Sequence, residues 1–148
     1  MQSKAGEADL GLNKDDFGTA IVQAAERIGE PLGMQPVGCE ATCVWMLSPH
    51  VTLTVAGGEA GRARGASVAW DMPKPDEAGR DLSAFSRGCR ALVAALRPDW
   101  PGERITEFVR ELSRPRASTP AAEEKQGGVS FVVSTDGSGR RICEARPG

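Results

Sequence analysis

Cysteines are the residues of this chain whose type and spacing most directly suggest chemistry. The sequence holds four of them, Cys39, Cys43, Cys89 and Cys143. The spacing Cys39-x-x-x-Cys43 differs from the Cys-x-x-Cys of thioredoxin-like redox proteins. It fits half of a zinc site, but Cys89 and Cys143 form no second short pair. We therefore predict no bound metal and no other cofactor.

Four cysteines allow three disulfide pairings, and local sequence does not choose among them. We favour Cys39–Cys43 and Cys89–Cys143, because Cys89 falls on an apolar helical stripe and would meet Cys143 if the last strand lies under that helix. An even cysteine count fits two disulfides and an oxidising compartment. The alternative is four reduced thiols, some of them buried as small apolar groups.

His50 is the single histidine, so any Cys/His or Ser/His catalytic site would have to use it. It lies in no recognisable nucleophile motif, and we interpret it as a polar residue at a strand end. The carboxylates fall mostly on helix starts and outer helix faces, where none forms an identifiable acid–base pair. We predict that the protein is not an enzyme. A less favoured reading is a thiol-dependent enzyme that uses Cys39 or Cys43 with His50.

A glycine-rich segment, residues 57–65, lacks the common phosphate-binding patterns and resembles the tip of a hairpin. Arg62 and Arg64 stand in it, and Trp70 ends the strand that follows. We expect these three residues to contribute to binding, with the arginines meeting an acidic group of the partner.

The composition indicates a folded domain. The chain has 148 residues, of which 40% are hydrophobic and 26% charged, with a net charge of −2. These values argue against a disordered chain and against a nucleic-acid-binding protein. The chain contains no apolar run that could span a bilayer, and its first residues show no hydrophobic signal segment. The abundance of arginine, alanine and glycine indicates a GC-rich bacterial genome.

The first helix and the first hairpin are well marked in the sequence. Asn13 is a favoured N-cap, an apolar stripe at helical spacing follows it, and Gly29 and Pro31 end the helix. Residues 44–55 end in alternation that places Val51, Leu53 and Val55 on one strand face. Residues 66–70 form the second strand of a hairpin. We expect residues 30–43 to be a connector.

The second half of the chain repeats the alternation of helices and strands. A helix opens at Asp81 or Ser83 and ends at Pro98, and a third runs between Pro101 and Pro115. We expect residues 114–127 to be a mobile surface loop. A second hairpin follows, formed by residues 129–133 and 140–145.

These elements predict an α+β fold with two layers: an antiparallel sheet of about four strands, made of two hairpins, and three helices in the order α-β-β-α-α-β-β. We expect residues 1–12 to be a flexible lead-in and residues 13–148 to form one domain. The most favoured function is a non-enzymatic binding or accessory domain, exported to the periplasm, the cell surface or the medium and acting through contacts with another protein. The alternative is a cytoplasmic interaction protein of the secretion-chaperone or immunity type.

Overall fold

The computed structural model describes residues 10–58, 61–71, 78–113, 121–126, 128–135 and 140–147. Within these ranges the chain forms three helices and seven strands. In chain order they are α1 (Lys14–Arg27), β1 (Gln35–Cys39), β2 (Thr42–Ser48), β3 (Val51–Gly57), β4 (Ala63–Trp70), α2 (Ala78–Leu96), α3 (Gly102–Ser113), β5 (Ala121–Gln126), β6 (Val129–Thr135) and β7 (Arg141–Pro147).

All seven described strands join one antiparallel sheet in the order β1-β2-β3-β4-β7-β6-β5. The sheet consists of two meanders, β1–β4 and β5–β7, each formed by strands that are consecutive in the sequence. The second meander folds back so that β7, the last strand, pairs with β4. This single pairing converts two local units into one sheet.

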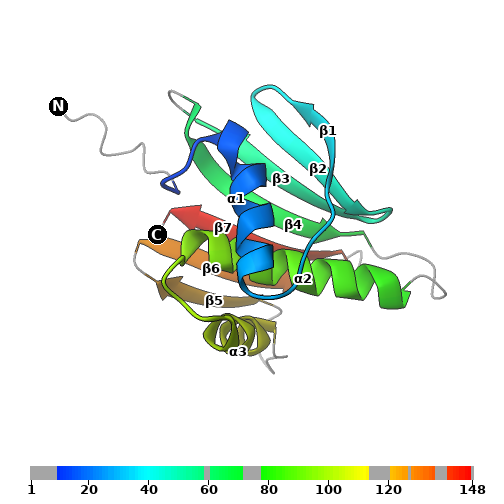
Figure 1. The fold of residues 1–148 in the computed structure, drawn as a ribbon, viewed down its shortest axis with the longest axis vertical. Coiled ribbons are helices and arrows are strands. Elements are labelled where there is room, and N and C mark those ends of the chain that lie inside the picture. The colour runs from blue at the N-terminus through cyan, green and yellow to red at the C-terminus, as the bar shows by residue number, and fades with distance from the viewer. Residues whose placement is uncertain are drawn as a thin grey trace.

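The three helices cover one face of this sheet (Figure 1). Helix α1 lies over the first meander, α2 crosses the centre, and α3 lies beside β5 and β6. The apolar side chains of the central strands point towards the helices, and Val51, Leu53 and Val55 are no more than 1% exposed. Alternation along β3 therefore sets which face becomes the core, as the sequence predicts.

The α+β class and the three helices are confirmed, but the sheet has more strands than the four expected. Residues 44–55 do not form one strand, because β2 and β3 are separate strands whose ends, Ser48 and Val51, pair directly. Pro49 and His50 form the tight connection between them, and a proline at the start of such a turn supplies the required backbone φ. The predicted first hairpin is thus part of a four-stranded meander.

Two further strands lie where connectors were expected. Strand β1 falls inside the expected connector 30–43, and β5 falls inside the expected mobile loop 114–127, of which residues 114–120 and 127 lie outside the described residues. Both strands are at the ends of the sheet, each paired with one neighbour. An edge strand does not need an alternating apolar face, and neither segment has one.

The helix ends agree with the sequence in most respects. Helix α1 follows Asn13 and stops before Gly29, which adopts a positive φ of 78°. The side chain of Asn13 forms no capping hydrogen bond; its backbone instead pairs with Arg62 in an isolated bridge. Helix α2 begins at Ala78, earlier than Asp81 or Ser83. Asp81 therefore lies within the first turn, where it is fully buried.

Within the expected lead-in of residues 1–12, residues 10–12 contact the start of β4, and residues 1–9 lie outside the described ranges. Leu10 is 6% exposed, and its N–H donates to the carbonyl of Ala63 at 2.9 Å. The Ala63 N–H in turn donates to Leu12 at 2.8 Å. None of the described helices is long and apolar enough to cross a membrane.

Candidate functional site

The first disulfide lies at the turn of the β1–β2 hairpin, at one edge of the sheet. Cys39 and Cys43 face each other as a cross-strand pair, and their sulfur atoms are bonded. Cys39 is exposed, whereas Cys43 is fully buried beneath the N-terminal end of α1. Cys39 is therefore the more accessible of the two cysteines.

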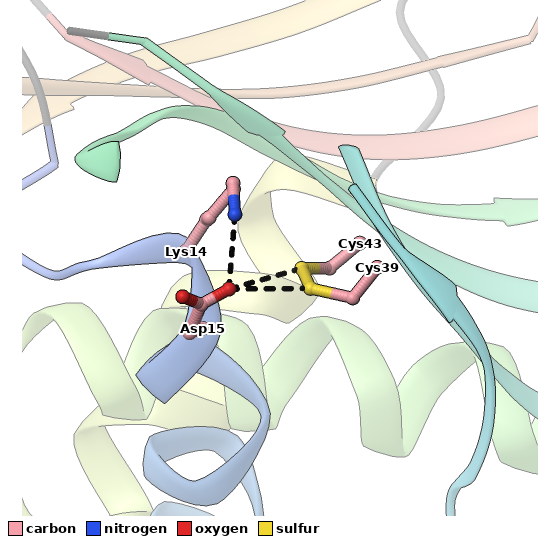
Figure 2. The surroundings of a disulfide bond; sticks show 4 residues. All are labelled: Lys14, Asp15, Cys39 and Cys43. Carbon is pink, nitrogen blue, oxygen red and sulfur yellow. Dashed lines mark hydrogen bonds and ion pairs between the residues drawn. A yellow bond between two sulfur atoms is a disulfide. The ribbon is translucent and has the colours of Figure 1, made fainter. Parts of the chain in front are cut away.

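Helix α1 places a carboxylate directly against this disulfide (Figure 2). Asp15 Oδ1 lies 3.3 Å from Cys39 Sγ and 3.9 Å from Cys43 Sγ. The same oxygen accepts a hydrogen bond from Lys14 Nζ at 2.9 Å. Both residues belong to the first turn of α1, where the helix dipole adds further positive potential. The disulfide thus faces a carboxylate that is itself paired with an ammonium group.

These groups also satisfy the minimum geometry for a metal site. Among the described residues, one donor atom each from Asp15, Cys39 and Cys43 lie within 4.8 Å of one another. A metal would require both cysteines to be reduced and deprotonated. Lys14 would then place a positive charge beside the cation. This neighbouring charge disfavours a metal ion at the three donors.

A shallow groove lies between α1 and the first two strands, near the disulfide. Its volume is about 440 Å³, and Asp15 lies at the end nearest the disulfide. The remaining lining residues come from α1, from β1 and the residue before it, and from β2; they are Gly18, Thr19, Val22, Gln23, Met34, Pro36 and Trp45. The lining therefore combines an apolar base with a few polar groups, a composition typical of binding sites.

Gly18 allows the base of the groove to form. A Cβ atom at this position would lie 2.6 Å from Trp45 Cζ2, well inside van der Waals contact. The indole of Trp45 therefore packs directly on the helix backbone, and it is only half-buried. The other two tryptophans, Trp70 and Trp100, are 4% and 6% exposed. Trp45 is the most exposed of the three indoles and forms part of the groove.

The second disulfide has a structural position. Cys89 of α2 and Cys143 of β7 are bonded in the pairing favoured from the sequence, and they are 1% and 0% exposed. This bond joins a helix to a central strand across a sequence separation of 54 residues. It therefore ties the two halves of the chain together inside the core.

His50 does not approach either cysteine of the first hairpin. It lies at the opposite end of β2 from Cys43, and five residue steps along a strand span about 16 Å. The combination of Cys39 or Cys43 with His50 that a thiol-dependent enzyme would need is therefore not assembled.

His50 instead forms a cluster with Ser48 and Asp81. The Ser48 hydroxyl donates to Asp81 Oδ1, and His50 Nδ1 lies 3.2 Å from Asp81 Oδ2. Asp81 is fully buried and stands between the other two residues, whereas a Ser–His–Asp site needs the histidine in the middle. His50 therefore does not act as a base for Ser48 in this arrangement. The cluster fastens the β2–β3 turn to α2.

The three binding residues expected from the sequence do not form one site. Arg62 lies beside the start of α1, with Nη1 3.5 Å from Asn13 Oδ1. Arg64 is exposed at the start of β4. Trp70 is at the other end of β4 and packs on Phe85 with a centroid distance of 6.0 Å. The expectation that Trp70 contacts a partner is therefore wrong, because this side chain belongs to the core.

Sequence reasoning missed the two carboxylates that matter most in these sites. From the sequence, Asp15 is interpreted as an acidic residue in the first turn of a helix, and Asp81 as a residue at which a helix begins. No local pattern links either one to the cysteines or to His50, because their partners are 24 to 33 residues away. No family model, curated protein or solved structure matches the chain.

Proposed function

We propose that the protein is a non-enzymatic binding domain that recognises an extended segment of another protein in the groove between α1 and β1–β2. The observation that carries this proposal is the half-buried Trp45 at the base of the groove, beside apolar side chains that no other described element covers. Aromatic residues in such positions are frequent anchors of protein interfaces.

The size of the groove favours one kind of partner. A volume of about 440 Å³ accepts a few side chains but not a second folded surface. Apolar groups on the partner would pack on Trp45 and Met34. Thr19 and Gln23 line the same groove and could hydrogen-bond the backbone of an extended segment.

Strand addition to β1 is a weaker explanation of binding. Pro36 lacks an N–H group, and the register of the β1–β2 pair shifts between Pro36 and Gly38. Short strands, prolines and bulges protect a sheet edge against pairing with another strand. Val37 lies between Pro36 and Gly38, where the register shifts, and it is 66% exposed. It lies outside the groove, so it is the control position for a substitution inside the groove.

Peptides selected from a random display library on the intact, oxidised protein test the groove directly. A selected peptide should shift the intrinsic tryptophan fluorescence of the wild type but not of Trp45→Phe, and Val22→Glu should weaken its binding at least tenfold. Val37→Glu should leave the affinity within twofold, because Val37 does not line the groove. Failure to select any peptide, or loss of affinity in Val37→Glu with Val22→Glu unaffected, would contradict the proposal.

We also propose an oxidising location, such as the periplasm, the cell surface or the medium. Its support is the presence of two bonded cysteine pairs, which fit the redox conditions outside the cytoplasm. Intact mass of the native protein, isolated with its thiols trapped, tests this. Reduction should add about four mass units, one proton per sulfur. No gain would favour the cytoplasmic interaction protein instead.

A further inference from the structure

The carboxylate of Asp15 lies against two sulfur atoms that carry no proton. While Cys39 and Cys43 are bonded, neither sulfur can donate a hydrogen bond to Asp15 Oδ1, although both lie within 4 Å of it. After reduction either thiol could donate to this oxygen. We propose that Cys39–Cys43 is a redox-active disulfide that exchanges with thiols, and that Asp15 stabilises its reduced form.

The accessibility of the two sulfurs defines the order of the steps. A substrate thiolate attacks the exposed Cys39 Sγ and forms a mixed disulfide, while the Cys39–Cys43 bond breaks. The electron pair of that bond leaves on Cys43 Sγ, and this thiolate is neutralised by the proton that the substrate thiol lost on ionising. A second substrate thiolate attacks the substrate sulfur of the mixed disulfide, and Cys39 leaves and is protonated. Two substrate thiols are oxidised to one disulfide, and two protein thiols form.

The first turn of α1 favours this exchange. Lys14 Nζ donates a hydrogen bond to the Asp15 oxygen that lies against both sulfurs, and the positive end of the helix dipole is in the same turn. Their positive potential offsets the negative charge of Asp15 and so lowers the cost of forming a cysteine thiolate beside it. Asp15 then accepts a hydrogen bond from the thiol that protonation produces. Lys14 thus acts on the thiolate form of the cysteines, and Asp15 acts on the thiol form that follows.

The two disulfides of the chain differ in what their reduction would do to the fold. Cys39–Cys43 spans a sequence separation of 4 within a hairpin that β1–β2 pairing also holds, whereas Cys89–Cys143 spans 54. A disulfide that closes a short loop removes less entropy from the unfolded chain. Cys89 and Cys143 are also both buried. The second disulfide is therefore an internal reference that should stay oxidised.

The substrate thiol has two sources. A small thiol such as glutathione would reach Cys39 from solvent. A cysteine within an extended peptide would reach it along the groove, since Asp15 contacts the disulfide and also lines the groove. A peptide that binds the groove and carries a cysteine should then react faster than glutathione, and Val22→Glu should slow only the peptide. Equal rates would assign the exchange to small thiols.

Equilibration of the intact protein with mixtures of reduced and oxidised glutathione tests the proposal. Acid trapping, alkylation and trypsin isolate Cys39 and Cys43 in one fragment, residues 28–62, which contains no other cysteine. The Cys39–Cys43 pair should be half-reduced at a glutathione ratio that leaves Cys89–Cys143 oxidised. Reduction of Cys89–Cys143 first, or of both pairs together, would overturn the proposal.

Substitution of the carboxylate tests its role. Asp15→Ala should shift the equilibrium about tenfold towards the disulfide, which corresponds to about 30 mV for a two-electron couple. Asp16→Ala is the matched control, because it removes an equal charge from the same turn at a residue with no recorded contact to either sulfur. Identical equilibria for the two variants would show that Asp15 does not stabilise the reduced form. This test does not depend on whether the groove binds a peptide.

Discussion

One buried carboxylate, Asp81, fixes the position of the β2–β3 turn. It is 0% exposed, accepts the Ser48 hydroxyl and lies 3.2 Å from His50 Nδ1. Burial of a carboxylate is unfavourable unless hydrogen bonds replace those lost to water. Its place in the first turn of α2 adds the favourable end of the helix dipole. The cluster therefore has a structural explanation that requires no catalysis.

Replacement of this carboxylate should destabilise the fold. Asp81→Ala leaves the buried Ser48 hydroxyl without its acceptor, and we expect the free energy of unfolding to fall by about 2–3 kcal/mol. Urea denaturation followed by circular dichroism measures the change. The control is Asp99→Ala at an exposed position, which should stay within about 0.5 kcal/mol of the wild type. Equal effects of the two substitutions would show that the cluster adds no stability.

Among the helices, α1 caps the end of α2 with a side chain. Arg27 Nη1 donates to the carbonyl of Trp100 at 2.7 Å, and Nη2 donates to Ala94 at 3.1 Å and to Arg97 at 3.4 Å. The last carbonyls of a helix have no partner within the helix, and they attract positive charge. One guanidinium thus joins α1, the end of α2 and the connection to α3.

Removal of this guanidinium should weaken the helical layer. Arg27→Met keeps the aliphatic part of the side chain but leaves the carbonyls to water, and we expect a loss of about 1–2 kcal/mol in unfolding free energy. Thermal and urea unfolding provide the measurement. Arg110→Met serves for comparison, because the Arg110–Glu107 pair is exposed on α3 and should contribute less than about 1 kcal/mol. The expectation fails if the two variants are equally stable.

The molecule as a whole is held together by the pairing of β4 with β7. The register runs from Ala66 opposite Ala145 to Trp70 opposite Arg141, and the Cys89–Cys143 bond lies above the same strands. The long-range order of the sheet depends on this junction, because all other strand neighbours are consecutive in the chain. The centre of the sheet should therefore be its most stable part.

Hydrogen exchange can measure this distribution of stability. We expect the slowest backbone amides in β3, β4 and β7, which are paired on both sides and covered by helices. Amides of the edge strand β1 should exchange at least ten times faster, a difference of about 1.4 kcal/mol in opening free energy. Equal protection in β1 and β4 would contradict this order. Repeating the measurement after reduction of Cys39–Cys43 should change β1 more than β4.

The sequence by itself determined the three helices and the apolar face of the central strands. Period-3.6 stripes and the alternation of Val51, Leu53 and Val55 are local signals that the fold obeys. The same stripe placed Cys89 inwards, which is why its pairing with Cys143 could be favoured. These features depend on neighbours along the chain, so they can be read without a structure.

Tertiary structure decided the edge strands and both polar clusters. Residues 121–126, Ala-Ala-Glu-Glu-Lys-Gln, are strong helix formers, yet they form β5 because β6 offers an unpaired edge. Asp15 and Asp81 acquire their roles from residues distant in sequence. Trp70 reads as a surface residue but is covered by α2. Packing between residues far apart in the chain determines these contacts. A pattern of neighbouring residues therefore does not predict them.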